Sequence, residues 1–167
     1  MQKITPYLWL NDQAEEAANL YVDVFKSRPG SGSGGESKVV DVTRYGEAGP
    51  GEPGTAMVAT FELDGQRFTA LNGGPQFTFT EAVSFLVSCQ SQEEVDYFWD
   101  ALTSDGGEES QCGWLKDRFG LSWQIIPDRL MELLGDPDPG RSQRAMQAML
   151  QMRRIDIATL EQAADAA

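Results

Sequence analysis

The chain contains no histidine, so the side chains that could do chemistry are carboxylates, hydroxyls, amides and two cysteines. A Ser-His-Asp triad, a Cys-His pair and an imidazole metal ligand are therefore all excluded. Cys112 is a candidate nucleophile only if the fold brings Lys116 or Arg118 close enough to stabilise its thiolate. The alternative, an inert cysteine, needs no such neighbour.

Polar and aromatic side chains gather on one side of three segments, residues 4–11, 82–90 and 121–127. In each segment the residue types alternate with a period of two, which is typical of a strand with two different environments. The more polar side carries Thr5, Tyr7 and Trp9, then Ser84 and Ser88, then Ser122 and Gln124. We expect this side of each strand to face away from the helices.

Aromatic walls with a few hydrogen-bonding groups are the usual composition of a small-molecule site. The polar strand faces, with the neighbouring strands and loops, predict a site of this kind. The predicted ligand-binding residues are Tyr7, Trp9, Asn72, Phe77, Ser84, Trp114 and Gln124. The alternative is that these side chains only fill the core. No catalytic residue can be assigned.

The net charge of −13 disfavours nucleic acid and anionic lipid as partners, because the chain would be repelled by their phosphates. No apolar run approaches the roughly 20 residues that a membrane-spanning helix needs. The first residues enter a strand pattern without the apolar block of a signal peptide, which predicts a cytoplasmic protein. In that compartment Cys89 and Cys112 are expected to be free thiols.

The elements that must position the site follow the same order twice. The first set is a strand, a helix capped by Asn11 or Asp12, and three strands at residues 38–45, 55–63 and 66–72. The second set is a strand, a helix opened by a capping box of Ser91 and Glu94, and strands at residues 108–116 and 121–127. The sequence does not place the third strand that would complete this second set.

This repeat predicts an α+β fold built from two successive modules of similar organisation. Module one spans residues 4–80 and module two spans residues 81–127, within a domain of residues 1–134. The glycine- and serine-rich residues 27–37 are interpreted as a flexible connection, since they follow a helix and lack the Lys-Ser/Thr end of a phosphate loop.

Beyond Pro127 the chain is predicted to be helical. One helix at residues 128–134 ends the domain, and helices at residues 141–152 and 156–166 form a C-terminal extension of residues 135–167. Its apolar residues, which include Met146, Met149, Leu150 and Met152, are too numerous for a solvated tail. They must pack on the same chain or on a partner subunit, and the sequence leaves both open.

The run CGWLKDRFGLSWQIIP at residues 112–127 resembles the last hairpin of the vicinal-oxygen-chelate superfamily, which includes glyoxalase I, bleomycin-resistance proteins and extradiol dioxygenases. Asp117 and Gly120 match the superfamily's D-x-x-G turn, and Gln124 stands where a metal-binding Glu usually follows. With LNGGPQF at residues 71–77, the chain is most similar to the PhnB-like branch, often labelled 3-demethylubiquinone-9 3-methyltransferase. The resemblance implies the glyoxalase/bleomycin-resistance fold, in which paired βαβββ modules form a cupped mixed sheet.

The resemblance also implies four metal-ligand positions, which fall on Thr5, Phe68, Ser84 and Gln124. Neutral side chains of these types cannot balance a divalent cation, whose sites use carboxylate, imidazole or thiolate groups. We therefore predict no metal and no cofactor. The methyltransferase label finds no support either, because the first strand is not followed by the glycine turn of a doubly wound nucleotide-binding sheet.

Two hypotheses follow. The first is a metal-free protein that binds a small, partly aromatic or apolar molecule in the cupped sheet. The second is an enzyme of undetermined reaction on such a molecule, acting through Tyr7 or a carboxylate that the sequence does not identify, and it includes the labelled ubiquinone-pathway methyltransferase. In either case we expect a homodimer, because proteins of the resembled fold commonly pair their modules across subunits.

Overall fold

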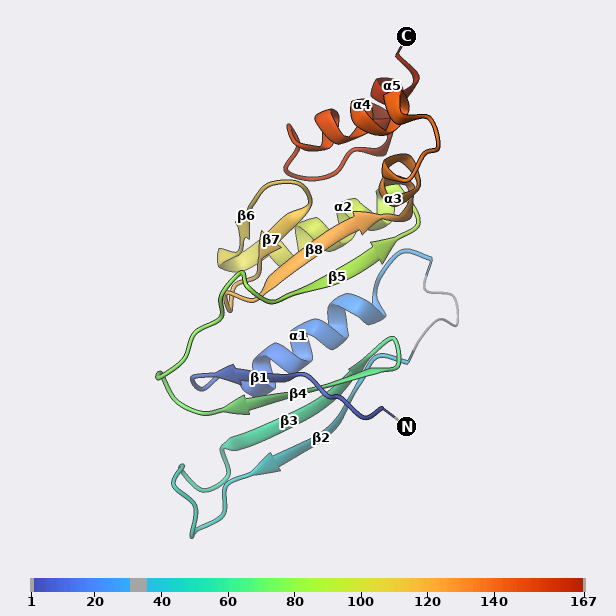
Figure 1. The fold of residues 1–167 in the computed structure, drawn as a ribbon. Helices are drawn as coiled ribbons and strands as arrows, with labels where there is room; N and C mark the ends of the chain where they lie inside the picture. The colour runs from blue at the N-terminus through green and yellow to red at the C-terminus, as the bar shows by residue number, and fades with distance from the viewer. Residues whose placement is uncertain (1, 31–35, 167) are drawn as a thin grey trace. The chain divides into compact units, whose positions relative to one another are not determined.

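The computed structural model describes residues 2–30 and 36–166, and the chain divides into two compact units, Met1–Phe79 and Thr80–Ala167. Each unit holds one four-stranded mixed sheet with a helix packed on it (Figure 1). Part of the predicted connection at residues 27–37, namely residues 31–35, lies outside the described residues. Within the described part of the chain, no helix combines the length and apolarity needed to cross a membrane.

The first unit has the strand order β1-β4-β3-β2, in which β1 and β4 run parallel and the other neighbours antiparallel. Its elements are β1 (Tyr7–Leu10), α1 (Ala14–Lys26), β2 (Lys38–Arg44), β3 (Ala56–Leu63) and β4 (Gln66–Asn72). Asp64 and Gly65 join β3 to β4 with φ values of 48° and 80°, the left-handed pair that a two-residue hairpin turn requires. The four strands predicted for this half of the chain are confirmed.

The start of α1 differs from its prediction. Neither Asn11 nor Asp12 caps the helix, and the residue at the cap position, Gln13, makes no side-chain capping bond. Instead, Oδ1 of Asn72 at the end of β4 accepts a hydrogen bond of 2.7 Å from the backbone N–H of Ala14. A residue 58 positions away therefore supplies the acceptor that local capping residues usually provide.

The second unit has the strand order β5-β8-β7-β6, in which β5 and β8 run parallel. Its sheet and helix are β5 (Ser84–Cys89), α2 (Gln92–Thr103), β6 (Glu108–Glu109), β7 (Trp114–Lys116) and β8 (Ser122–Pro127). The capping box of α2 is confirmed, because Ser91 Oγ accepts from the N–H of Glu94 at 3.2 Å. The Glu94 carboxylate accepts from the N–H of Gln90 at 2.7 Å, one residue before the cap position.

The single strand predicted over residues 108–116 is wrong, since two strands, β6 and β7, occupy that range. A turn separates them, with Cys112 at φ 58° and Gly113 at φ 85°. A Cβ on Gly113 would lie 2.8 Å from Ile126 Cδ1 and 3.0 Å from a β8 carbonyl oxygen. The glycine thus permits both the turn and its close packing, and β6 completes the second βαβββ unit.

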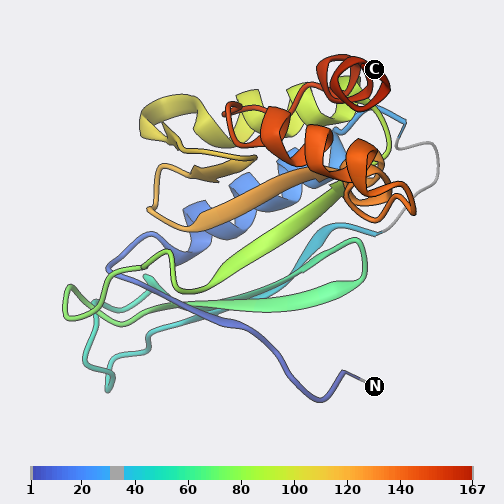
Figure 2. The ribbon, with the colours of Figure 1, turned by 45° about the horizontal axis from the view of Figure 1, so that its top comes forward.

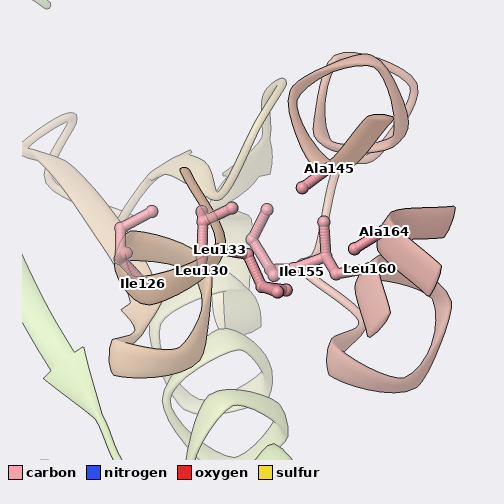
Figure 3. Packing of buried hydrophobic residues seen from close by; sticks show 7 residues of the cluster. All are labelled: Ile126, Leu130, Leu133, Ala145, Ile155, Leu160 and Ala164. Atoms are coloured by element: carbon pink, nitrogen blue, oxygen red, sulfur yellow. The ribbon is translucent and has the colours of Figure 1, made fainter. Parts of the chain in front are cut away.

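Three further helices follow β8: α3 (Asp128–Leu134), α4 (Pro139–Met149) and α5 (Ile157–Asp165). Helices α4 and α5 lie side by side, as Figure 2 shows. Together with β8 and α3 they enclose a hydrophobic cluster, drawn in Figure 3. The buried members of this cluster are Ile126, Leu130, Leu133, Ala145, Ile155, Leu160 and Ala164.

The segment between α4 and α5 is hydrogen-bonded to the rest of the second unit. The backbone N–H groups of Cys112 and Gly113 donate to the carbonyl oxygens of Met152 and Arg153, at 2.8 and 2.7 Å. The side-chain amide of Gln92 donates to the carbonyl of Ile155 at 2.9 Å, and its oxygen accepts from the N–H of Ile157 at 2.8 Å. The C-terminal helices therefore pack on their own chain.

Candidate functional site

One face of the first sheet points away from α1 and carries two predicted site residues, Tyr7 and Trp9. Leu8, which alternates with them along β1, is 5% exposed on the helix-covered side, whereas Tyr7 is 64% exposed. In register, Tyr7 lies beside Thr69 and Trp9 beside Leu71, so these four side chains share the open face. The predicted orientation of the first strand is confirmed.

Trp9 is held by the loop that follows β4. Its indole N–H donates to the carbonyl of Gly74 at 2.9 Å, and its ring meets that of Phe77 edge to face with centroids 4.9 Å apart. A Cβ on Gly73 would lie 2.3 Å from the indole ring, so the ring packs directly on the Gly73 backbone. The structure thus joins Trp9 and Phe77 into one aromatic pair, and Phe77 remains 64% exposed.

Asn72 is structurally engaged on the opposite, helix-covered side. Its Oδ1 accepts from Ala14 and its Nδ2 donates to the carbonyl of Ala56 at 2.9 Å, so both ends of the amide are used within the first unit. Asn72 therefore holds the end of β4 against the start of α1. A contribution of Asn72 to ligand binding remains a prediction.

Replacement of Asn72 by alanine is expected to lower the free energy of unfolding by about 1–3 kcal/mol, because a helix cap and a half-buried backbone bond are lost together. The measurement is urea denaturation followed by circular dichroism. Asn11→Ala is the matched control and should change stability by less than about 0.5 kcal/mol, as expected for an exposed residue without a capping role. Equal effects of the two substitutions would contradict the assigned cap.

A hollow of about 350 Å³ lies at the other end of this face, lined by Gln2, Thr5, Glu62, Gly65 and Arg67. The Glu62 side chain is only 17% exposed, and its Oε1 accepts from Nε and Nη2 of Arg67 at 3.2 and 2.8 Å. Sequence reasoning identified no carboxylate on this face. The pairing of β3 with β4 places Glu62 on this face, because Glu62 lies directly beside Arg67 in register.

Phe68, one of the four implied ligand positions, does not share this face. Its ring is 6% exposed on the helix-covered side of β4 and stacks on Phe61 with centroids 5.5 Å apart. The expectation that Phe68 faces the same side as Thr5 is therefore wrong. Phe68 points to the opposite side of the strand from its two sequence neighbours. The neighbouring positions Arg67 and Thr69 occupy the open face instead.

The second sheet also has a face that points away from its helix, and it carries Ser84, Trp114 and Gln124. Nε2 of Gln124 donates to Oγ of Ser84 at 2.9 Å, across neighbouring parallel strands. Trp114 lies directly beside Gln124 in the antiparallel pair of β7 and β8. These three predicted residues therefore come together within the second unit.

A buried carboxylate fixes the turn that leads into β8. Asp117 is 2% exposed, and its Oδ1 accepts from the N–H groups of Phe119 and Leu121 at 2.9 and 3.1 Å. Its Oδ2 accepts from the indole N–H of Trp123 at 2.9 Å. Gly120 completes the turn at φ 85°. The Asp-x-x-Gly turn thus sets where β8 starts and which of its residues share the face of Gln124.

The two cysteines occupy different environments, and both are free thiols. Cys89 is fully buried, and burial, with smaller contributions from Glu94 and Asp128, raises the pKa of its thiol from 9.0 to about 12. Cys112 is half-buried in the β6–β7 turn.

At pH 8, a disulfide reagent is expected to modify Cys112 in the folded protein and Cys89 only after unfolding, because thiolate is the reactive species. Since folding raises the pKa of Cys89, its contribution to stability is complete below pH 9.0 and is lost as the pH rises toward about 12. Cys89→Ala should therefore weaken the alkaline loss of stability. Modification of two thiols per folded chain would contradict this assignment.

The metal chemistry implied by the resemblance does not fit the residues present. Thr5, Ser84 and Gln124 are neutral, and Phe68 is buried elsewhere. Among residues 2–30 and 36–166, no three Asp, Glu or Cys side chains are grouped as a metal site would require. The absence of a bound metal nevertheless remains a prediction.

Comparison with known families decides where the chain belongs. The sequence model of the family described as 3-demethylubiquinone-9 3-methyltransferase matches residues 2–126. The chain belongs to this family. The match ends inside β8, so helices α3, α4 and α5 of this family member lie beyond it.

Solved structures similar to the chain include a protein of the same family and a more distant protein that shares the fold. A PhnB protein from Bacillus cereus, described as a candidate 3-demethylubiquinone-9 3-methyltransferase, is 36% identical with a TM-score of 0.65, over 75% of this chain and 99% of that one. Protein PA1353 from Pseudomonas aeruginosa is 20% identical with a TM-score of 0.59, over 76% and 98% of the two chains. No curated protein matches the sequence.

The fosfomycin resistance protein FosX from Listeria monocytogenes is a more distant match, 12% identical with a TM-score of 0.48 over 76% of this chain and 93% of that one. The predicted PhnB-like membership is confirmed, and so is the α+β fold of paired βαβββ modules with C-terminal helices, of the glyoxalase/bleomycin-resistance type.

Proposed function

We propose that this PhnB-like protein binds a small, partly aromatic or apolar molecule on the open faces of its sheets, without a metal ion. The observation that carries the proposal is the aromatic pair of Trp9 and Phe77, beside the 64% exposed Tyr7. Large aromatic side chains that stay exposed on one face are unfavourable in water and are typical of a binding surface. The structure fixes the indole ring through Gly73 and Gly74, which preorganises this surface.

The test is a thermal-shift screen against aromatic and apolar metabolites, with and without Zn²⁺ or Mn²⁺. Compounds that raise the melting temperature are then titrated against Trp9→Ala and Phe77→Ala. Each substitution should weaken binding about tenfold or more, as expected when a ring contact is lost. Met146→Ala, which removes an exposed apolar side chain from α4, is the control and should leave affinity unchanged.

Two results would contradict the proposal. If no compound stabilises the protein, or if the aromatic substitutions leave affinity unchanged, the open face of the first sheet is not the binding surface. If the purified protein carries one equivalent of a transition metal by elemental analysis, the metal-free part is wrong.

Catalysis on the bound molecule is the second candidate function, and Glu62 is the observation that favours it. Its carboxylate is largely buried beside Thr5 and oriented by Arg67, which are the surroundings of a positioned general base. If the protein turns over a ligand from the screen, Glu62→Gln should abolish product formation. Glu36→Gln, at an 83% exposed carboxylate, should not. The methyltransferase named by the family label would instead require a methyl donor, and neither four-stranded mixed sheet resembles a doubly wound nucleotide-binding sheet.

A homodimer and a cytoplasmic location complete the proposal. The exposed apolar side chains of Met131 on α3, Met146 on α4 and Leu150 directly after α4 support an association surface. Light scattering should report about 37 kDa, twice the 18.4 kDa of one chain. A monomer at micromolar concentration would exclude the dimer, and cell fractionation tests the location.

A further inference from the structure

One buried hydroxyl, on the face of the second sheet that points away from α2, has no hydrogen-bond partner in the described part of the chain. Ser122 is 1% exposed, and its Oγ contacts no donor or acceptor among residues 2–30 and 36–166. A buried hydroxyl without a partner destabilises the folded state, so proteins rarely keep one that has no use. Alanine would fill the same position without this cost.

The neighbours of Ser122 are hydrogen-bond donors. In register, Ser122 lies between Ser84 on β5 and Lys116 on β7, so the three side chains share one face. Gln124 donates one amide hydrogen to Ser84 Oγ, which leaves the second amide hydrogen and the Ser84 hydroxyl hydrogen for another acceptor. We call Ser84, Lys116, Ser122 and Gln124 the donor cluster.

The charge beside the donor cluster is positive at Lys116. Its ammonium group pairs with the Glu81 carboxylate, which raises the pKa of Lys116 and keeps the group charged. The Glu81 side chain is 62% exposed, and an exposed ion pair of this kind is weak enough to be exchanged for another anion. A second acid, Glu108, lies beside Lys116 on the side away from Ser122.

We propose that the donor cluster holds an oxygen acceptor of the ligand, in the form of a carboxylate, against Ser122 and Lys116. The inference rests on the proposed binding function and names the chemical class of the ligand at the second sheet: an aromatic or apolar molecule that carries a carboxylate. The ligand oxygen accepts from the Ser122 hydroxyl and from the Lys116 ammonium group. Ser122 thereby gains its missing partner, and no metal is needed to balance the ligand charge.

Three matched pairs of probes test this inference: phenylacetate with 2-phenylethanol, 3-phenylpropionate with 3-phenylpropanol, and indole-3-acetate with indole-3-ethanol. Binding is followed by ¹⁵N–¹H NMR titration of the full chain, which reports separately on the backbone amides of Ser122 and Gln124. At least one carboxylate should bind about tenfold more tightly than its alcohol, which corresponds to one charge-assisted hydrogen bond.

Ser122→Ala should weaken carboxylate binding about tenfold and leave alcohol binding unchanged. It should not lower the melting temperature, because it removes an unpartnered group. Lys116→Met should have the same selective effect. Ser88→Ala, at an exposed position on the same face, is the control and should change neither affinity.

The outcomes separate the two proposals. If carboxylates and alcohols bind equally, or if Ser122→Ala leaves carboxylate affinity unchanged, the donor cluster does not bind a carboxylate. The proposed binding function would still stand. If neither the six probes nor the metabolite screen gives saturable binding, the proposed function itself fails, and this inference fails with it.

Discussion

A chain that ends at Leu134 is expected to lose the folded state of its second unit. The truncation removes Ala145, Ile155, Leu160 and Ala164 from the hydrophobic cluster and leaves the buried faces of β8 and α3 open to water. Each large side chain lost from such a cluster costs about 2–5 kcal/mol, and the whole domain is stable by only about 5–15 kcal/mol. NMR spectra of the truncated chain should lack the dispersed resonances of residues 80–134.

Two single substitutions measure the contribution of the cluster to stability without shortening the chain. Leu160→Ala, at a residue that is fully buried in the cluster, should lower the free energy of unfolding by about 2–5 kcal/mol. Leu150→Ala makes the same chemical change at a residue that is 53% exposed, and it should cost less than about 1 kcal/mol. A stable, fully dispersed chain of 134 residues would show that the C-terminal helices are dispensable additions.

Asp117→Ala is expected to destabilise the second unit by about 3–5 kcal/mol, because three N–H donors lose the buried carboxylate that accepts their hydrogen bonds. Two of these donors are backbone groups of the turn, and the third is the indole of Trp123. The fluorescence of the tryptophans and the denaturation midpoint in urea should both change. Since the turn sets the start of β8, the hydrogen bond between Gln124 and Ser84 should weaken as well.

Asp100→Ala is the matched control for Asp117→Ala. The Asp100 carboxylate pairs with Arg154 on the surface of the same unit and is 68% exposed. Loss of such an ion pair costs at most about 1 kcal/mol. If the two substitutions have similar effects, the hydrogen bonds of Asp117 do not hold the turn.

Period-two alternation was sufficient to predict which strand residues share a face, because the buried side of a strand is apolar and the other side is more polar. This is why the orientation of Tyr7 and Trp9, and that of Ser84 and Gln124, follow from the sequence. Glu62 was missed because β3 alternates only weakly, and its face is defined by hydrogen bonding to β4. Strand pairing is a property of two segments, so one segment alone does not contain it.

Two other differences have the same physical origin. The cap of α1 comes from Asn72, which no local pattern around residues 11–13 could indicate. The turn between β6 and β7 places a cysteine at φ 58°, a conformation that residue type does not predict outside Gly, Asn and Asp. In both places tertiary contacts replace the local signals on which sequence reasoning depends.

The backbone amides of Cys112 and Gly113 report on the opening of the C-terminal helices, because they donate hydrogen bonds to Met152 and Arg153. Their hydrogens can exchange with solvent deuterium only when the acceptor segment moves away. Where the segment recloses faster than the open amides exchange, the exchange rate at these two positions therefore gives the free energy of that opening. A fusion partner placed after residue 167 would reveal any interference with the fold as faster deuterium uptake at residues 112 and 113, long before the protein unfolds.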